Sequence, residues 1–387
     1  MKLAVDARTI FRTERRGTGK NLVDLVRHIA TLRPAWEIVL FHRGGRDAEH
    51  DSPFADHPNV QPRFIEIPGD RWDAWQQVRL PWAVWRAGAD VLHCPANTAP
   101  RWCPVRRVVT IHDLIPMDKR FNPDGAEAWA ADVTRAARKA AAILTPSAFT
   151  AELVERTLGV SADKITVNGW APDAACQRVT DQAALTDVRG RYGLDVEGRY
   201  VLAFGGADPR KNTARLLDAW AAIERPVRAG WSLLVVGLGP AELERFGRRA
   251  VALDIAGGCR LHGFADEADL PALVSGAEVM AYPSLSEGFG LPIVDAFVCG
   301  TAVLTSRTTS MPEIAGPAAE LVDPEITADI ARGLTLLMTE PERRARYVTA
   351  GLERATLFNW DATARRAIEV FERVAGDEGP GDHEDVT

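Results

Sequence analysis

Short apolar runs alternate along the chain with longer segments in which apolar residues recur every three or four positions. In the first half the apolar runs predict strands at 2–6, 36–42, 62–67, 90–93, 107–111 and 142–145. In the second half they predict strands at 200–204, 231–236, 260–264, 278–282 and 302–304. Strands that alternate with helices are typical of parallel sheets covered by helices, so the pattern predicts an α/β fold.

The alternation restarts once, which predicts two domains. Residues 172–198 are polar and show no clean period, so we expect a connection between a domain at 1–175 and a domain at 199–360. The 387 residues leave room for two domains of ordinary size. The end of the chain, 376–387, is acidic and rich in glycine, and we expect it to be disordered.

The stretch Tyr282-Pro-Ser-Leu-Ser-Glu287-Gly-Phe-Gly-Leu-Pro-Ile-Val-Asp295 is the most informative in the chain. A predicted strand runs into a loop of small residues, and Pro292 marks the start of an apolar helix. The free N–H groups of such a helix terminus attract anions, phosphate above all. Glu287 and Asp295 flank this terminus, eight residues apart and on the same side. A phosphate cradle between two carboxylates suits a sugar nucleotide, and an ordinary strand–helix unit with an exposed Glu287 is the alternative.

A second candidate anion site follows the predicted strand at 200–204. Two glycines end this strand, and Arg210 and Lys211 precede a helix that we expect near Thr213. Arg offers a planar fork and Lys a compact charge, and a diphosphate can use both at once. Fixed cations stabilise a departing diphosphate more than its ground state. The alternative is a solvated basic loop.

The first half contributes two further candidates. His112 and Asp113 emerge at the carboxyl end of a predicted buried strand, where ligands bind in open α/β sheets; a structural role for His112 is the alternative. The loop Gly17-Thr-Gly19-Lys-Asn21 after the first strand can face a phosphate or an acceptor. Because Asn21 stands where a P-loop has Ser or Thr, nucleotide hydrolysis is not expected.

These elements, in this order, resemble the retaining glycosyltransferases of the GT-B fold, in particular the large family 4 of that class, over nearly the whole chain. The resemblance implies two Rossmann-like domains that face a cleft, with residues 361–375 as a helix that crosses back to the first domain. It implies transfer of a sugar from a nucleoside-diphosphate donor to a hydroxyl acceptor, with retention of the α configuration. No Asp-x-Asp motif occurs in the chain, so neither a catalytic metal nor a cofactor besides the donor is expected.

The resemblance also implies residue roles. Glu287 contacts the hydroxyls of the donor sugar, Arg210 and Lys211 bind the diphosphate, and His112 faces the sugar from the opposite domain. Asp295 holds the ribose in a position where the family usually has Glu, whose side chain is longer by one methylene. The other residues expected to contact the nucleotide or the acceptor are Gly17, Gly19, Gly205, Gly206, Gly237, Phe264, Gly288, Phe289, Gly290 and Leu291.

The segments Thr-Ile-His-Asp-Leu-Ile-Pro and Asp-Pro-Arg-Lys-Asn look most like bacterial mannosyltransferases that build surface polysaccharide, such as lipopolysaccharide, from GDP-mannose. The expected acceptor is a glycan or a lipid-linked oligosaccharide. Users of UDP-sugars share nearly all these residues and stay open as an alternative. A GT-B sugar-nucleotide epimerase and a sugar-nucleotide-binding protein with little turnover also stay open. Glu242 stands at the third glycine position of a dinucleotide fingerprint that begins at Gly237, so NAD binding is not supported.

Charge and cysteine usage limit the partners and the compartment. Residues 1–190 carry a net charge of +3 and residues 191–387 a net charge of −10. The acidic half speaks against nucleic acid as a partner, and the mildly basic half suits an anionic acceptor or anionic lipid head groups. Five scattered cysteines without a C-x-x-C pair predict neither a disulfide framework nor a zinc site and fit a reducing cytoplasm. The start of the chain leads straight into a strand, which is not typical of a signal peptide.

Trp72, Trp75, Trp82 and Trp85 recur close to one helical face, with several arginines nearby. Aromatic and basic residues on a surface helix are typical of a contact with a lipid interface. Packing of the tryptophans on the sheet, with Pro81 bending the helix, is the simpler alternative. No apolar run of about 18 residues occurs, so we expect a cytoplasmic protein, either free or peripheral on the inner face of the membrane.

Overall fold

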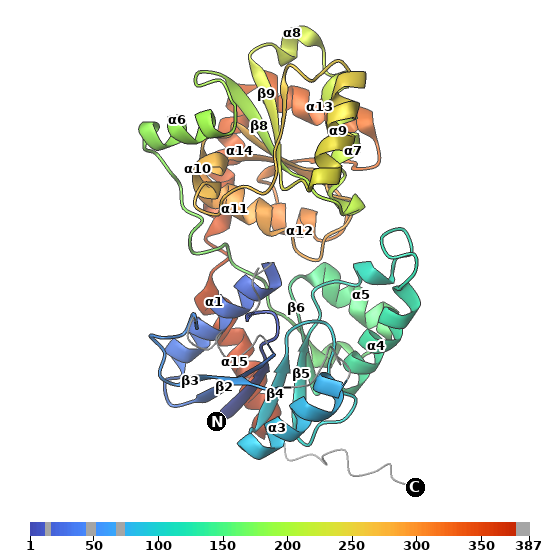
Figure 1. Cartoon of the computed structure of the whole chain (residues 1–387), viewed down its shortest axis with the longest axis vertical. Helices are drawn as coiled ribbons and strands as arrows, with labels where there is room; N and C mark the ends of the chain where they lie inside the picture. The colour runs from blue at the N-terminus through green and yellow to red at the C-terminus, as the bar shows by residue number, and fades with distance from the viewer. Residues whose placement is uncertain (12–16, 44–51, 67–73, 377–387) are drawn as a thin grey trace. The chain divides into compact units, whose positions relative to one another are not determined.

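The computed structural model describes residues 1–11, 17–43, 52–66 and 74–376 (Figure 1). The chain forms two compact units: Met1–Ala171 together with the segment from Asn359 on, and Pro172–Phe358. Each unit contains one parallel sheet with helices against it, which confirms the predicted fold class. The predicted acidic tail lies outside the described residues, apart from Gly376, which ends the last helix.

The first unit is built on a seven-stranded sheet in the order β3-β2-β1-β4-β5-β6-β7, with every neighbouring pair parallel. Most residues of its central strands are buried and many are apolar, as expected when helices cover both faces, although Asp6, His93 and Arg107 are buried polar exceptions. Pro62 lacks a backbone N–H and lies in β3, at the edge of the sheet, where that loss is tolerated. The strands are β1 (Lys2–Asp6), β2 (Glu37–His42), β3 (Val60–Phe64), β4 (Val91–Cys94), β5 (Arg106–Thr110), β6 (Ala142–Thr145) and β7 (Ile165–Val167).

Helices α3 (Leu80–Ala87), α4 (Ala126–Lys139) and α5 (Ala148–Leu158) pack apolar side chains against one face of this sheet. The last helix, α15 (Trp360–Gly376), lies against α1 (Gly17–Leu32) and contacts β4, β5 and β6 (Figure 1). Thr363 Oγ1 donates to the carbonyl of Gly169 at 2.6 Å. The C-terminal helix therefore completes the unit that contains the N-terminus.

The second unit has a six-stranded parallel sheet in the order β10-β9-β8-β11-β12-β13. Apolar residues of α7 (Thr213–Ala222), α9 (Pro240–Ala252) and α13 (Thr327–Thr339) form its core with the sheet. Helices α10 (Leu270–Ser275), α11 (Leu291–Cys299) and α14 (Pro341–Ala355) lie side by side. The strands are β8 (Arg199–Phe204), β9 (Trp231–Val236), β10 (Cys259–Leu261), β11 (Val279–Tyr282), β12 (Ala302–Ser306) and β13 (Ala319–Val322).

The segment 172–198, which we expected to be a connection, is part of the second unit and contains helix α6 (Gln182–Arg191). This helix contacts α10, and Tyr192 just after it donates its hydroxyl to Asp269 Oδ2 at 3.1 Å. Only Val188 is buried within α6 itself. A helix with so narrow a buried face leaves no apolar period in the sequence, which is why the pattern did not predict it.

The tryptophan segment combines a π-helical turn, η2 (Trp75–Arg79), with α3. Trp75 is fully buried in the core, so the packing hypothesis is correct for this residue. It is wrong for Trp82 and Trp85, which are 50% and 62% exposed. Trp72 lies outside the described residues.

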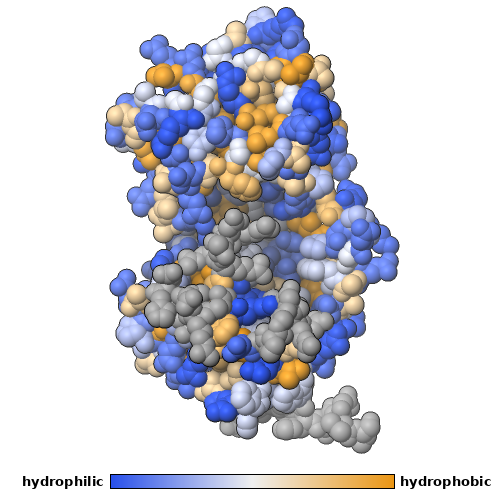
Figure 2. Space-filling view, viewed as in Figure 1, coloured by the Kyte–Doolittle hydropathy of each residue, from blue (hydrophilic) through white to orange (hydrophobic). Residues whose placement is uncertain are grey.

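The surface view in Figure 2 shows hydrophilic residues over most of the visible face, interspersed with hydrophobic ones. Among the described residues no helix is both long and apolar enough to cross a membrane. Within the same residues, no three His, Cys, Asp or Glu side chains come together as a metal site would require.

Candidate active site

The second unit has a topological switch point between β8 and β11, where the strand order reverses. Ligands of open α/β sheets bind beyond the carboxyl ends of the strands at such a point. The loop after β8 contains Arg210 and Lys211, and the loop after β11 contains Glu287. Because β8 and β11 are parallel neighbours, these loops meet although they are about 76 residues apart.

The loop after β8 ends in a short 3₁₀ helix, η5 (Pro209–Lys211). Asp208 caps it by accepting from the backbone N–H of Arg210 at 2.9 Å. Asn212 then adopts a left-handed conformation with φ 59°, which Asn tolerates better than most residues. Its amide donates to the carbonyls of Pro283 and Pro324 at 2.9 and 2.7 Å. The sequence Asp-Pro-Arg-Lys-Asn therefore fixes this loop against the end of β11.

Arg210, Lys211 and Glu287 form one ion cluster. Arg210 Nη1 lies 2.8 Å from Glu287 Oε2, and Lys211 Nζ lies 3.1 Å from Glu287 Oε1. Arg210 Nε also pairs with Asp208 at 2.7 Å. Tyr282 and Ser284 donate their hydroxyls to Glu287 Oε1 at 2.5 and 2.8 Å. Two cations are thus held in place by two carboxylates, and the loops that carry them are tied together.

Burial and charge act in opposite directions on this cluster. Burial raises the pKa of Glu287, but Lys211, Arg210 and the two hydroxyl donors outweigh it, so the pKa lies below its ordinary value. Burial likewise lowers the pKa of Arg210, and Glu287 and Asp208 outweigh it in the opposite direction. Both groups are therefore charged at neutral pH.

The loop before α11 is held in an unusual conformation. Gly290 has φ 104°, a region that L side chains rarely adopt, and Leu291 begins the helix. Ser310 donates to the carbonyls of Glu287 and Phe289 at 2.9 and 3.0 Å. Thr309, a β-branched residue with φ 57°, accepts from the N–H of Glu287 at 3.2 Å. Backbone strain of this kind is concentrated at functional sites.

The other predicted glycines of this unit lie near the same sheet edge, and the physical constraint differs from one glycine to the next. A Cβ at Gly205 would lie 2.5 Å from Leu238 Cδ2 and 2.8 Å from Val235 Cγ1, so packing requires this glycine. Gly206 faces open space by comparison, with its nearest neighbours at 3.9 Å. Gly237 has φ 89° and donates its N–H to the carbonyl of Gly263 at 2.8 Å. Phe264, in the loop after β10, is 85% exposed.

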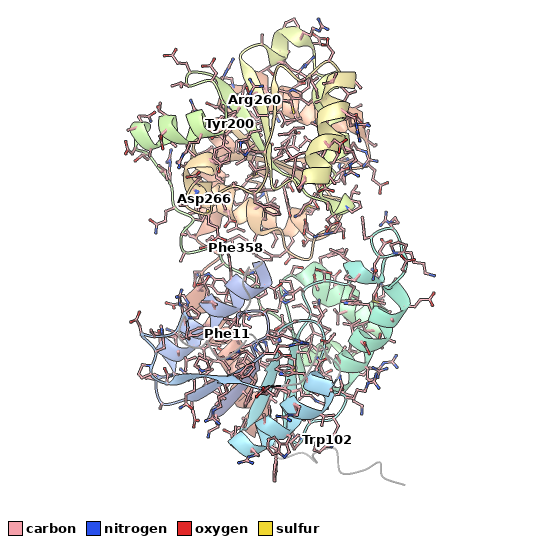
Figure 3. The ribbon with its side chains drawn as sticks, viewed as in Figure 1. Phe11, Trp102, Tyr200, Arg260, Asp266 and Phe358 are labelled. Carbon is pink, nitrogen blue, oxygen red and sulfur yellow. The ribbon has the colours of Figure 1, made fainter. Side chains whose placement is uncertain are left out.

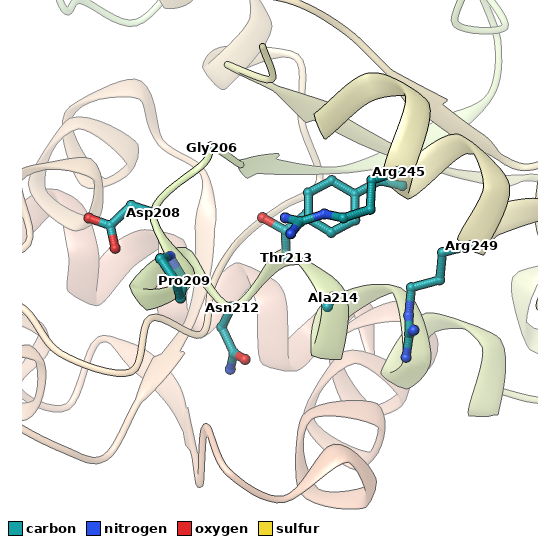
Figure 4. A pocket seen from close by; sticks show the side chains of 9 residues that line it. Gly206, Asp208, Pro209, Asn212, Thr213, Ala214, Arg245 and Arg249 are labelled. Atoms are coloured by element: carbon teal, nitrogen blue, oxygen red, sulfur yellow. The ribbon is translucent and has the colours of Figure 1, made fainter. Parts of the chain in front are cut away.

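A pocket of about 280 Å³ lies beside the η5 loop, where Asp208, Pro209 and Asn212 contribute to its lining (Figure 4). Arg245 and Arg249 of α9 point toward it, and Arg249 is paired with Asp218 at 2.5 Å. Arg210, Lys211 and Glu287 are not among its lining residues, whereas Asp208, which pairs with Arg210, is, so the pocket adjoins the ion cluster without containing it. Its lining residues are Gly206, Asp208, Pro209, Asn212, Thr213, Ala214, Arg245, Phe246 and Arg249.

Asp295 lies in α11, half-buried, eight residues after Glu287. Its backbone carbonyl accepts a weak hydrogen bond from Cys176 Sγ at 3.7 Å, and Cys176 lies 3.5 Å from Cys299 Sγ. The ribose contact that the resemblance implies for Asp295 stays a prediction.

His112 belongs to the first unit and follows β5. Its Nε2 lies 2.5 Å from the carbonyl of Pro95, so Nε2 carries the proton and donates it. The ring stacks on Trp170 with centroids 5.3 Å apart. Burial lowers the pKa of His112 to about 4, against a smaller opposing effect of the bond to Pro95. The imidazole is therefore neutral at physiological pH.

Gly17 and Gly19 were expected in a loop, but both lie in the first turn of α1, which begins at Gly17. The first turn of a helix has no intrahelical partners for its N–H groups, so these groups are available to other acceptors. Arg15 and Arg16, which precede them, lie outside the described residues.

The sequence predicted no role for Tyr282, Ser284, Thr309 or Ser310, although their hydroxyls hold Glu287 and its loop. Tyr282 and Ser284 stand within the stretch that we recognised, so a search for hydroxyls near Glu287 would have found them. Thr309 and Ser310 lie about 22 residues further on, and only the pairing of β11 with β12 brings them near.

Two parallel-sheet units, the second with paired cations and a carboxylate at its switch point, define the class of the protein as GT-B. Solved structures support the fold. The sucrose-phosphate synthase of Thermosynechococcus elongatus superposes with a TM-score of 0.76 and 18% identity, over 97% of this chain and 99% of the other. Anabaena Alr3699/HepE in complex with UDP-glucose superposes with a TM-score of 0.75 and 16% identity, over 96% of this chain and 100% of the other.

Family matches cover most of the sequence. Residues 186–354 match the glycosyl transferases group 1, and residues 15–168 match glycosyltransferase family 4. The O-antigen chain mannosyltransferase B of Escherichia coli is 27% identical over 92% of this chain and 95% of its own length. The chain therefore belongs to the GT-B glycosyltransferases and is mannosyltransferase-like.

Proposed function

We propose that this glycosyltransferase moves mannose from GDP-mannose to a hydroxyl of a glycan or lipid-linked acceptor, with retention of configuration, during synthesis of a surface polysaccharide. The O-antigen mannosyltransferase that the chain resembles over nearly its full length supports the sugar and the pathway class. The observation that carries the proposal is the contact of Arg210 and Lys211 with Glu287 at the switch point of the second sheet.

In the proposed reaction the bond between the anomeric carbon and the diphosphate oxygen breaks, and both electrons leave with the diphosphate. Arg210 and Lys211 stabilise the charge that develops on this leaving group, because they are fixed before the reaction starts. The acceptor hydroxyl attacks the anomeric carbon from the face that the diphosphate leaves, and its proton passes to the departing diphosphate. Exclusion of water protects the cationic sugar from hydrolysis.

Glu287 is proposed to contact the donor sugar, and in the structure both its oxygens are engaged by cations. A diphosphate that binds Arg210 and Lys211 competes with Glu287 for them and frees a carboxylate oxygen for a sugar hydroxyl. His112, neutral and with its Nε2–H held by Pro95, keeps its proposed role as a contact to the sugar rather than as a charged acid. Asp295 keeps the proposed ribose contact.

The donor is tested by a thermal-shift panel of GDP-, UDP-, ADP- and dTDP-sugars, because a ligand that binds only the folded state raises the melting temperature. We expect GDP-mannose to give the largest rise in melting temperature. A larger rise in melting temperature with a UDP-sugar would show that the donor is a UDP-sugar, and the proposed enzyme class would not change. No shift with any of the four would overturn nucleotide-sugar binding.

Acceptor dependence separates a transferase from an epimerase or a binding protein without turnover. Release of GDP from GDP-mannose should rise when a mannose-containing oligosaccharide is added, and the product should show an α-linkage by NMR. Release that is equally fast without acceptor would favour the epimerase, and a β-linked product would exclude retention.

We also propose that the first unit rests on anionic membranes through its exposed tryptophans. Trp82, Trp85 and Trp102 are all at least half exposed, and Trp102 projects from the fold in Figure 3. The guanidinium of Arg86 lies over the ring of Trp82 at 4.8 Å, and Arg79 and Arg101 are exposed on the same segments. Indole rings with nearby cations suit an anionic lipid interface.

Sedimentation with vesicles tests the membrane proposal. Vesicles that contain phosphatidylglycerol should carry the protein down, and neutral phosphatidylcholine vesicles should not. The W82A/W85A variant should lose most of this binding, whereas L357A, which removes an exposed apolar side chain of the second unit, should keep it. Equal sedimentation of both variants would contradict the proposal.

A further inference from the structure

Tyr282 lies at the end of β11, with its ring buried and its hydroxyl between two charged groups. The hydroxyl donates to Glu287 Oε1 at 2.5 Å and accepts from Lys211 Nζ at 2.9 Å. The same ammonium group lies 4.8 Å from the centroid of the Tyr282 ring. One side chain therefore contacts both members of the Lys211–Glu287 ion pair.

The geometry points to Tyr282 as a positioning residue for the proposed transfer: its hydroxyl sets where Lys211 Nζ and Glu287 Oε1 lie relative to one another. The inference rests on the proposed function, since it assigns Lys211 to the diphosphate and Glu287 to the sugar. Tyr282 acts through these two residues and need not touch the donor itself.

A hydroxyl is suited to this task in a way that a second charge is not. It can donate to a carboxylate and accept from an ammonium at once, so it links two opposite charges without adding a third. When a diphosphate draws Lys211 away from Glu287, the hydroxyl keeps a partner on each side. The carboxylate also retains Ser284, which donates to Oε1 at 2.8 Å. Each side chain therefore keeps a hydrogen-bond partner when the Lys211–Glu287 ion pair opens.

The alternative is that Tyr282 only fills the core. Its ring is buried in the second unit, and a buried hydroxyl needs a partner whatever the function. The chain offers a matched control for this alternative. Tyr200 of β8, the neighbouring strand, is also buried, and its hydroxyl donates to the backbone carbonyl of Leu273 at 2.6 Å. Tyr200→Phe loses a buried hydrogen bond of the same kind with no link to the ion cluster.

The experiment compares Tyr282→Phe with Tyr200→Phe in a GDP-mannose transfer assay, with melting temperatures of both. We expect Tyr282→Phe to lower kcat about tenfold, the effect of one hydrogen bond to a charged group. Tyr200→Phe should keep kcat within about twofold while losing a similar amount of melting temperature. Equal kcat losses in the two variants would show that Tyr282 is structural.

The pH profile gives a second measurement that a structural role would not change. Glu287 faces Arg210, Lys211, Tyr282 and Ser284, and the hydroxyl of Tyr282 is among the groups that keep its pKa low. Loss of this donor should move the acid limb of kcat/KM to higher pH in Tyr282→Phe and leave it in place in Tyr200→Phe. An unmoved acid limb in Tyr282→Phe would overturn the inference.

A double-mutant cycle tests whether Tyr282 acts through Lys211. Tyr282→Phe should lower kcat/KM less in the Lys211→Ala background than in the wild-type background, because only the contact of its hydroxyl with Glu287 is then lost. Additive losses would contradict the link. If Lys211→Ala and Glu287→Ala both keep wild-type turnover, the proposed function fails and the inference with it. If both lose turnover while Tyr282→Phe matches Tyr200→Phe, only the inference fails.

Discussion

Glu287 determines the charge balance at the switch point of the second sheet. Its carboxylate accepts from Arg210, Lys211, Tyr282 and Ser284, so removal of its charge leaves two partly buried cations with less compensation. A diphosphate would meet the same cations and has to compete with this carboxylate for them. The residue is thus both a stabilising group and a competitor of the proposed ligand.

Two opposite effects are therefore expected in Glu287→Gln. The variant should unfold about 1–3 kcal/mol more easily, because a buried ion pair loses one partner. It should bind GDP, which has no sugar, several-fold more tightly than the wild type, because the competing charge is gone. Urea unfolding and calorimetric titration with GDP check both effects.

Glu244→Gln is the control for this prediction, since Glu244 pairs with Arg248 on the exposed face of α9. An exposed pair contributes little, so stability and GDP affinity should both stay close to wild type. Weaker GDP binding in Glu287→Gln would show that the carboxylate supports the diphosphate site rather than competing with it.

At the level of residues, the sequence predicted which charged groups meet but not what holds them. Arg210, Lys211 and Glu287 were predicted together from a motif resemblance, and the structure brings them into contact. The hydroxyls of Thr309 and Ser310 were not found, because contacts between consecutive strand ends depend on tertiary structure. The position of His112 with respect to a donor stays a prediction.

Two adjacent glycines after β8 show how an element constrains its sequence. A methyl group at Gly205 would collide with Leu238 and Val235. A methyl group at Gly206 has enough space. Both were predicted as nucleotide contacts, and packing alone explains the first. The backbone N–H of Gly205 is also engaged, by the carbonyl of Val236 at 2.8 Å.

Gly205→Ala should destabilise the protein by about 1–3 kcal/mol, because two side chains have to move to admit the methyl group. Gly206→Ala should change stability by less than about 0.5 kcal/mol. Thermal or urea unfolding of the two variants measures the difference. Equal losses would show that the backbone at Gly206 is more constrained than its open surroundings indicate.

Three of the elements that the sequence did not predict are short or bury few apolar residues. β7 has three residues and β13 four, so neither gives a clear apolar period. Helix α6 buries a single residue, and its contacts come from the neighbouring α10. The predicted strand at 260–264 ends at Leu261, because the next residues pair with the loop after β9 instead: the N–H of Leu238 donates to the carbonyl of His262 at 3.2 Å.

For the whole molecule, two histidines with lowered pKa values make stability depend on pH. Burial, with a smaller effect of His112, lowers the pKa of His93 to about 3, and burial lowers that of His112 to about 4. His93 donates to or accepts from Thr110 Oγ1 at 2.8 Å and packs on Phe371 of α15. In the folded protein both imidazole rings therefore stay neutral over most of the pH range in which the same histidines take up protons in the unfolded chain.

Because the folded pKa values lie below the ordinary 6.5, the unfolded state takes up protons first as the pH falls. Stability should therefore drop from about pH 6.5 toward pH 4, by at most roughly 1.4 kcal/mol per pH unit for each histidine. The depressed pKa of Glu287 adds a loss only at more acidic pH. Urea unfolding at pH 7, 6 and 5 checks the slope, and His93→Gln should reduce it. A stability that is constant from pH 7 to 5 would contradict this account.

Arg210 and Lys211 are proposed to bind the diphosphate of a nucleotide sugar. Calorimetric titration of GDP into the wild type, Arg210→Ala, Lys211→Ala and the control Arg248→Ala measures this binding. We expect at least a tenfold loss of affinity in Arg210→Ala and in Lys211→Ala, because each loses a charge-assisted contact, and no loss in Arg248→Ala. GDP affinity that is unchanged in both Arg210→Ala and Lys211→Ala would contradict the proposed binding.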